Sequence, residues 1–92
     1  MAMYLVCFDI SDDKSRYRVV KALMHYGLRV QYSVFELIIT TPTQLQELID
    51  RLRPHTEDDD SIRLYRLCRN CQKQAVDLHE REIASLPRVV VV

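Results

Sequence analysis

The sequence predicts an α+β fold of the ferredoxin-like type, in which two helices cover one face of a single antiparallel sheet. Two observations support this prediction. Strand-like runs alternate with helix-like runs in the order β-α-β(β)-α-β, and both helix-like runs begin with capping residues. The strand-like runs span 4–8, 28–40 and 62–68, and the helix-like runs span 14–26 and 42–53.

The first strand and helix are marked by an apolar run and by capping chemistry. The continuous apolar run from Tyr4 to Phe8 is typical of a strand buried on both faces, and so of a central strand. The Ser-Asp-Asp segment at 11–13 offers side-chain oxygens to the free N–H groups of a helix start. Gly27, the only glycine in the chain, is expected to close this helix as a left-handed C-cap.

The second helix carries the clearest local signals. Thr41 is a suitable N-cap, Pro42 suits the first helical position, and Gln44 completes a capping box. Leucine and isoleucine then recur at helical spacing until Pro54 ends the pattern. Local signals describe the preceding run, 28–40, as one long strand.

The C-terminal part contains further strand-like pieces, Val76–His79 and Arg88–Val92. A free apolar strand at a chain end is an aggregation hazard, so we expect Val89–Val92 to pair with a sheet edge. That edge belongs either to the same chain or to a partner. We expect the segment to pair with the partner's edge. Residues 75–92 would then be a C-terminal strand extension that contributes to a dimer.

One domain over 1–92 accounts for the chain, because the sequence shows no repeat and no linker. A chain of this size buries roughly two-thirds of its extended surface, which is too little for a large enclosed active-site cavity. No apolar run is long enough to span a bilayer, and the N-terminus lacks the basic residues of a signal peptide. Three cysteines argue against a disulfide framework. We expect a cytoplasmic protein with no membrane contact.

The net charge of zero hides a segregated pattern. Residues 14–35 carry five basic and no acidic side chains, and residues 61–74 carry four basic and no acidic ones. Residues 1–13 carry three acids and no base. Such segregation indicates either one basic and one acidic face or local salt bridging within helices and strands.

Two sequence blocks resemble a known family. They are Phe8-Asp9-Ile10-Ser11-Asp12-Asp13, followed by Arg16-x-Arg18, and Tyr26-Gly27-Leu28-Arg29-Val30-Gln31-Tyr32-Ser33-Val34-Phe35-Glu36. Together they resemble the small CRISPR-associated endonuclease family, the second Cas protein, an adaptation subunit that partners the CRISPR integrase. The resemblance is close over roughly residues 1–40, and the remainder fits in length and element order.

The resemblance implies a ferredoxin-like βαββαβ homodimer in which 28–40 forms two short strands joined by a tight turn near Tyr32-Ser33. It implies an endonuclease that uses Mg²⁺ or another divalent cation to cleave phosphodiester bonds of RNA or duplex DNA. It also implies a scaffold role in spacer acquisition. The expected partners are therefore a second copy of the chain, the CRISPR integrase subunit, and DNA or RNA.

Asp9 is the candidate catalytic and metal-binding residue. An acid at the end of a buried strand is costly unless it is solvated, hydrogen-bonded or bound to a metal. Taken alone, Asp9 reads as the start of a loop, and one carboxylate per chain is a poor metal site. Mg²⁺, however, keeps several waters and often takes only one or two carboxylates with substrate phosphates, and a two-fold dimer brings two Asp9 copies together. With the family motif in view, the metal interpretation is favoured.

Arg16, Arg18 and Arg29 are the candidate nucleic-acid-binding residues. Arg16 and Arg18 fall in the first turns of a helix, where a cation opposes the helix dipole. This small penalty favours a phosphate-facing role over a purely solvent-facing one, and Arg16 is expected near Asp9. Taken alone, Arg29 is a polar strand residue exposed to solvent. The family motif indicates that it contributes to the nucleic-acid-binding cleft.

Gln31, Ser33 and Phe35 are assigned by the resemblance to support of the cleft or the dimer interface. Taken alone, Gln31 and Ser33 read as surface and turn residues. Phe35 is an apolar strand residue, so packing in the core or at an interface is its main interpretation and base stacking the minor one.

Phe8 stands where the family usually has tyrosine, so a hydroxyl group beside the metal-binding aspartate is absent. The alternative function is therefore a catalytically inactive, DNA-binding structural subunit of the integration complex. A third hypothesis, a small-molecule sensor or metallochaperone of the same fold, requires a ligand pocket; the sequence contains neither a phosphate-binding glycine loop nor a complete metal-ligand set.

Cys68 and Cys71 have Cys-x-x-Cys spacing, but one pair supplies only two of the four ligands that zinc normally takes. His79 would be a third ligand at an unusual distance. We expect partly buried free thiols, with zinc shared across a dimer as the alternative. Cys7 is expected in the core.

Overall fold

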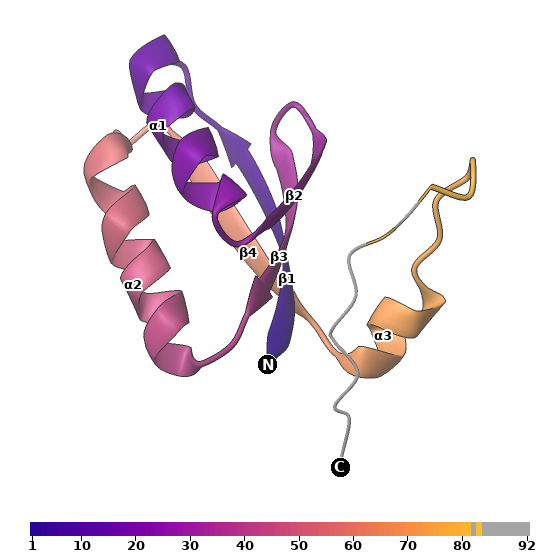
Figure 1. Cartoon of the computed structure of the whole chain (residues 1–92). Coiled ribbons are helices and arrows are strands. Elements are labelled where there is room, and N and C mark those ends of the chain that lie inside the picture. The colour runs from indigo at the N-terminus through magenta and orange to yellow at the C-terminus, as the bar shows by residue number, and fades with distance from the viewer. Residues whose placement is uncertain (82, 84–92) are drawn as a thin grey trace.

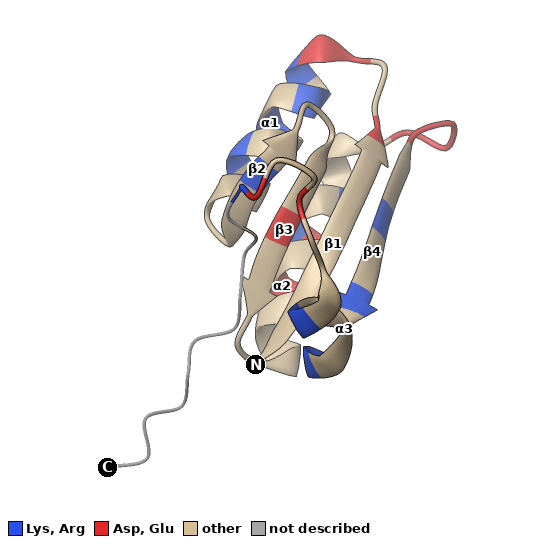
Figure 2. Ribbon diagram, turned by 90° about the vertical axis from the view of Figure 1, so that its right-hand side faces the viewer, with Lys and Arg blue, Asp and Glu red and all other residues tan. Residues whose placement is uncertain are grey.

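The computed structural model describes residues 1–81 and 83, and it places two helices, α1 and α2, on one face of a sheet (Figure 1). A third helix, α3, and the residues 75–81 that follow it lie on the opposite side of the sheet (Figures 1 and 2). The elements are β1 (Ala2–Asp9), α1 (Asp13–Met24), β2 (Gly27–Gln31), β3 (Val34–Ile39), α2 (Pro42–Leu52), a 3-10 turn (Arg53–His55), β4 (Ser61–Leu67) and α3 (Arg69–Gln74).

The sheet order is β2-β3-β1-β4 with every neighbouring pair antiparallel, which confirms the ferredoxin-like prediction. β1 is central, as its apolar run predicted. A turn at Tyr32 and Ser33 separates β2 from β3, which confirms the break implied by the family resemblance. The Arg29 side chain stabilises this turn, because its Nε and Nη2 atoms donate to the Tyr32 carbonyl oxygen at 3.1 and 2.6 Å.

The core lies between the sheet and the helices α1 and α2. The rings of Phe8 and Phe35, on adjacent strands, have their centroids 6.2 Å apart at its centre. Because side chains alternate along a strand, the residues between core positions point to the other face. The buried core residues are Val6, Phe8, Ile10, Val19, Val20, Ala22, Leu23, Phe35, Leu37, Ile39, Leu48 and Leu52.

The face of the sheet turned away from α1 and α2, called the far face below, is also largely apolar. Parts of it are exposed to solvent, since Leu28 is 48% and Tyr65 is 47% exposed. Leu5 lies between them, in register with Tyr65 on one side and with Glu36 on the other. An apolar sheet face that one chain leaves partly uncovered is suited to contact with another chain.

α2 begins at the predicted cap, with the Thr41 hydroxyl accepting from the Gln44 N–H at 3.1 Å. The capping box is shifted by one residue, because the Gln44 side-chain oxygen accepts from the Thr40 N–H rather than from that of Thr41. α2 ends at Leu52, and Pro54 lies within the 3-10 turn that continues it. The cap and its reciprocal bond fix where the chain leaves β3 and enters α2.

Gly27 does not cap α1, so that prediction is wrong. The C-cap is His25, which has an ordinary right-handed φ of −72°, and Gly27 is instead the first residue of β2. A Cβ atom on Gly27 would lie 1.9 Å from the Glu36 carbonyl oxygen and 2.8 Å from the Leu37 Cα. Glycine is therefore required by the close approach of two backbones, not by a left-handed conformation.

Replacing Gly27 with alanine is expected to lower the free energy of unfolding by roughly 1–3 kcal/mol, because the backbone of β3 must move to admit the methyl group. Thermal or urea denaturation measures this change. Gln31→Ala, at the exposed C-terminal end of the same strand, is the matched control, and its free energy of unfolding is expected to change little. An unchanged stability for Gly27→Ala would mean that β2 and β3 do not approach this closely.

The chain after β4 differs from the prediction. Residues 69–74 form the short helix α3, which the sequence patterns did not indicate. Val76–His79 is irregular and leads into a turn rather than forming an extended piece, and no strand pairs with it among the described residues. The predicted strand Val89–Val92 and most of the extension 75–92 lie outside the described residues. None of the described helices is long and apolar enough to cross a membrane.

Candidate metal and nucleic-acid site

Asp9 is exposed at the end of β1, and its alternation with the core residues puts it on the far face. Its backbone pairs with that of Ser61 at the start of β4. Within residues 1–81 and 83, its carboxylate has no hydrogen-bond or ion-pair partner. Phe8 is 5% exposed and belongs to the core, so the aromatic ring of this position lies on the opposite face of the sheet from Asp9.

Arg16 braces the loop that follows Asp9. Its Nη1 atom donates to the Ile10 carbonyl oxygen at 3.0 Å, and its Nη2 atom forms an ion pair with Asp13. The hydrogen bond to Asp13 is the main cause that raises the pKa of Arg16 above its usual value. The guanidinium thus contacts the loop directly after Asp9, and an acid of the same helical turn offsets the unfavourable position of the cation near the helix start.

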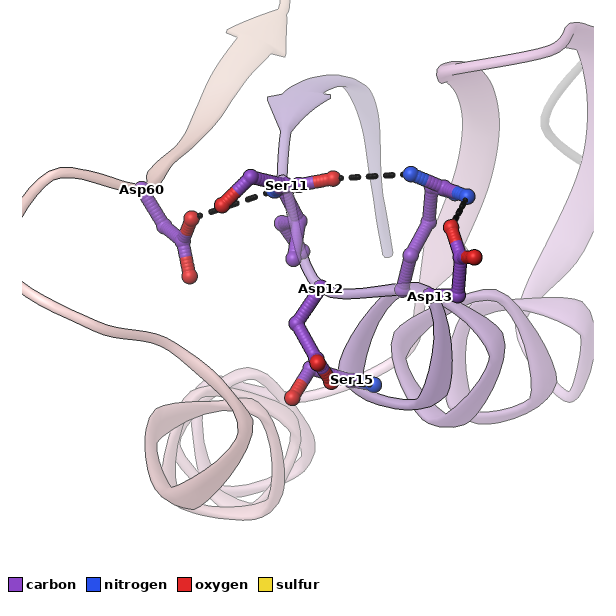
Figure 3. A network of polar contacts seen from close by, with 7 residues as sticks. Ser11, Asp12, Asp13, Ser15 and Asp60 are labelled. Atoms are coloured by element: carbon purple, nitrogen blue, oxygen red, sulfur yellow. Dashed lines mark hydrogen bonds and ion pairs between the residues drawn. The ribbon is translucent and has the colours of Figure 1, made fainter.

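Two more acids at this end of the sheet bind backbone N–H groups (Figure 3). The Asp12 carboxylate caps α1, as predicted, by accepting from the Ser15 N–H at 2.8 Å. This bond, with a second from the Ser15 side chain, lowers the pKa of Asp12. Asp60 accepts from the Ser11 N–H at 3.3 Å, which connects the loop after β1 to the loop before β4. Backbone capping therefore explains both carboxylates without a metal.

Tyr32, in the turn between β2 and β3, brings two of the candidate arginines together. The Arg29 guanidinium carbon lies 4.9 Å from the centroid of the Tyr32 ring, and that of Arg16 lies 5.6 Å from it. Arg29 also lies 5.9 Å from the centroid of the Phe35 ring. Cation–π contacts of this kind hold a guanidinium in one place while leaving its N–H groups able to bind an anion.

Sequence reasoning described Tyr32 only as a turn residue and missed this role. The signal that could have found it is an aromatic residue in a turn that lacks glycine and asparagine, three positions after an arginine. Tyr32 is 67% exposed, so its ring stands at the surface with the two guanidinium groups beside it.

The other candidate residues lie around this cluster or beneath it. Arg18 is exposed on α1, and Gln31 is exposed at the end of β2. The Ser33 carbonyl oxygen accepts from the Phe8 N–H at 3.0 Å, so the turn is attached to the strand that ends in Asp9. Phe35 is fully buried and lies on the core side of the sheet, which places it below Arg29 rather than on the far face.

The segregated charges of the sequence fall on different parts of the fold (Figure 2). Basic residues follow α1 and recur along β4 and α3, whereas acidic residues gather where β1 ends and β4 begins. Local pairing also occurs, as Arg16 and Asp13 show. The basic helix α1 therefore begins beside the acidic end of the sheet at which Asp9 is exposed.

Asp9 fits a magnesium ion only in part. The described residues hold no group of three or more His, Cys, Asp or Glu side chains placed to bind a metal ion. One chain therefore offers a single carboxylate at this position, too little for a metal cage built from protein alone. The donor is of the right kind for Mg²⁺, which takes one or two carboxylates and completes its shell with water and phosphate oxygens.

The cysteines are free thiols, as predicted for Cys68 and Cys71, but their burial differs from the predictions. Cys68 and Cys71 are exposed rather than partly buried, because they flank the first turn of α3, which stands off the sheet (Figure 1). Cys7 is half-buried on the far face rather than in the core, because it alternates with Val6 and Phe8. All three are free thiols.

Comparison with known proteins identifies relatives over most of the chain. Residues 1–75, which include every candidate metal and nucleic-acid residue above, match the family model described as CRISPR associated protein Cas2. A CRISPR-associated endoribonuclease Cas2 from Synechocystis sp. is 36% identical over 93 residues, with both chains covered in full. Another, from Rhodospirillum rubrum, is 37% identical over 85% of this chain, but this chain spans only 63% of that protein.

Solved structures agree with the sequence comparison. A chain from a partial Cas6-RT-Cas1–Cas2 complex superposes with a TM-score of 0.80 at 36% identity, and the match covers 100% of both chains.

Proposed function

Because the chain belongs to the CRISPR-associated Cas2 family, we propose that it is a CRISPR adaptation protein, a homodimeric nucleic-acid scaffold with Mg²⁺-dependent endonuclease activity. The observation that carries the proposal is the exposed, unpartnered Asp9 carboxylate within residues 1–81 and 83, at the end of the partly uncovered far face. The scissile bond is a phosphodiester of RNA or duplex DNA, and the cell compartment is the cytoplasm.

The far face is the proposed dimer contact. Its exposed apolar residues Leu28 and Tyr65 would be covered by a second copy, as would Val76 and Leu78, which are 85% and 92% exposed in the chain after α3. A two-fold axis repeats every residue across the interface. Asp9, at one end of that face, would then meet the partner copy of itself, and the C-terminal extension would pair with the partner's sheet.

Two facing Asp9 carboxylates would supply the protein ligands that one chain lacks. These carboxylates would hold a Mg²⁺ ion, which would supply an activated water and offset the negative charge that develops on a phosphate. The chain's own residues do the rest: Asp9 contributes the carboxylate, and Arg16 fixes the loop behind it through Ile10. Arg29, held by Tyr32, offers N–H groups to a phosphate close to that loop.

Nucleic-acid binding is proposed to be driven by the phosphate backbone. Arg18 is exposed on the basic helix α1, and Arg29 is exposed on the neighbouring strand β2. Neither site offers a side-chain pattern that reads base edges, so the arginines contribute affinity and position rather than sequence preference.

Arg18→Ala is expected to weaken binding to all sequences about equally and to lower the slope of log affinity against log salt by about 0.9 for each phosphate that the variant no longer neutralises. Fluorescence anisotropy with duplex DNA and RNA at several salt concentrations measures both effects. Arg51→Ala is the matched control, because it removes the same charge from α2, which also carries Glu47 and Asp50. Sequence-specific, salt-insensitive binding would contradict the proposal.

The CRISPR integrase is the proposed protein partner. A structural relative that is covered in full is a chain of a partial Cas6-RT-Cas1–Cas2 complex. When the far faces are joined, the side of each chain that carries α1 and α2 is left available to the integrase. Co-purification of the two proteins from one cell tests this association.

The second candidate function is a structural DNA-binding subunit without cleavage. The observation that favours it is Phe8, where the family usually has tyrosine. Phe8 is buried on the core side of the sheet, and Asp9 is exposed on the far face. The side chain at position 8 therefore does not contact the Asp9 carboxylate, so the missing hydroxyl group does not affect it directly. The endonuclease remains the preferred proposal. Metal-dependent cleavage that disappears in Asp9→Ala separates the two functions.

A further inference from the structure

The chain carries a pair of exposed cysteines at the start of α3 that the proposed nuclease does not use. Cys68 is the N-cap of α3, and Cys71 lies one helical turn later. The Cys68 sulfur accepts a hydrogen bond from the Cys71 N–H at 3.4 Å, so the side chain of Cys68 is folded over the turn that contains Cys71. Both thiols are free and open to solvent.

The two thiols differ in acidity. The backbone N–H of Cys71, and then its thiol, donate to the Cys68 sulfur and lower the pKa of Cys68. The same hydrogen bond between the side chains raises the pKa of Cys71. The surroundings also favour a thiolate, because residues 61–74 contain four basic side chains and no acid. One sulfur is thus prepared to attack and the other holds its proton.

We propose that Cys68 and Cys71 form a redox-active dithiol that exchanges with small-molecule disulfides. The Cys68 thiolate attacks one sulfur of the disulfide, which forms a mixed disulfide and releases the other half as a thiolate. Cys71 then loses its proton and attacks the Cys68 sulfur, which forms the Cys68–Cys71 bond and releases the second half. The protein dithiol is oxidised by two electrons, and one small disulfide is reduced to two thiols.

A metal site is the competing use of this pair. Zinc takes four ligands, and the described residues offer no third His, Cys, Asp or Glu close enough to form a site with these two. A solvent-exposed Cys-x-x-Cys pair, in which one sulfur accepts hydrogen bonds from the other cysteine, is the arrangement that disulfide exchange uses. In this chain the new bond would fix the junction between β4 and the first turn of α3.

Trypsin provides a direct test, because it cleaves after Arg66, Arg69 and Lys73, and so between the two cysteines. The reduced full-length chain is incubated with oxidised and reduced glutathione, free thiols are blocked with iodoacetamide, and the digest is analysed without reduction. We expect the peptides 67–69 and 70–73 to appear linked by a disulfide, in a chain that runs as a single subunit on a denaturing non-reducing gel.

Single-cysteine variants assign the attacking sulfur. Cys71→Ser should accumulate glutathione on Cys68, on the order of tenfold faster than Cys68→Ser accumulates it on Cys71. Cys7→Ser is the control and should form the linked peptides at the wild-type rate. Equal rates for the two variants, no linked peptides under glutathione, or zinc that binds and protects both thiols would each overturn the proposal.

Discussion

Asp9→Ala is expected to reduce Mg²⁺-dependent phosphodiester cleavage by on the order of a hundredfold or more, since the metal contributes several kcal/mol to stabilising the transition state. Nucleic-acid binding should remain, because the arginines proposed to contact the phosphate backbone, Arg18 and Arg29, are exposed on α1 and β2. Chelation of the metal should reproduce the same reduction in the wild-type protein. Cleavage of a labelled oligonucleotide, with binding measured in parallel, checks both expectations.

Two further variants make this result specific. Asp9→Asn keeps the size of the side chain and removes its charge, so it should abolish cleavage without disturbing the sheet. Asp58→Ala removes an exposed acid from the loop before β4, at the same end of the sheet, and should cleave like the wild type. Full activity in Asp9→Asn, or equal reductions in Asp9→Asn and Asp58→Ala, would mean that the Asp9 carboxylate has no specific role in cleavage.

Phe35→Ala is expected to cost about 3–5 kcal/mol of the free energy of unfolding, because it leaves a cavity in the centre of the core. Phe35 is 0% exposed and packs against Phe8. The total free energy of unfolding of a small domain is roughly 5–15 kcal/mol, so this single change should bring the protein close to unfolding at ordinary temperatures. Circular dichroism melts at equal protein concentration measure the change, because the stability of a dimer depends on concentration.

Tyr32→Ala is the matched control for this prediction. It removes another aromatic ring from the same hairpin, but that ring is 67% exposed. Its melting temperature should stay near that of the wild type, whereas nucleic-acid binding should weaken because the ring no longer holds Arg16 and Arg29 in place. A stable Phe35→Ala variant would mean that Phe35 serves an interface rather than the core.

The fold could be predicted where periodicity and capping agree. The cap at Asp12, the cap at Thr41 and the apolar run of β1 each determine their element locally, and the structure confirms them. The turn between β2 and β3 could not be found this way. It contains no glycine or asparagine. It depends on hydrogen bonds from the Arg29 side chain and on the bond from Phe8 to Ser33, and this last bond forms only when the hairpin lies beside β1.

Gly27 and α3 were missed for different physical reasons. A lone glycine after a helix usually indicates a left-handed cap. Here glycine is required because the backbone of Glu36, on the next strand, leaves no room for a Cβ atom. α3 is only six residues long and is capped by the sulfur of Cys68, a residue that is not a usual N-cap. Neither an amphipathic pattern nor a standard cap marks such a helix.

The sequence indicated which residues of the candidate site are exposed, but not the contacts between them. Asp9 lies at the exposed strand end that the motif indicated, and Arg18 and Arg29 are exposed as a nucleic-acid surface requires. The part taken by Arg16 in bracing the loop, and the contact of two arginines with Tyr32, depend on distances between separate elements. Sequence patterns contain the residue types and not these distances.

The proposed dimer joins two copies through their far faces and brings their Asp9 carboxylates together. A spin label at position 9 tests this arrangement directly, in an Asp9→Cys variant whose three native cysteines are replaced by serine. Pulsed electron paramagnetic resonance then measures the separation of the two labels. We expect one short, narrow distance distribution, which broadens or disappears when Leu5→Arg is added to the far face. A chain that gives no dipolar coupling at micromolar concentration, or a single long distance, would contradict the far-face dimer.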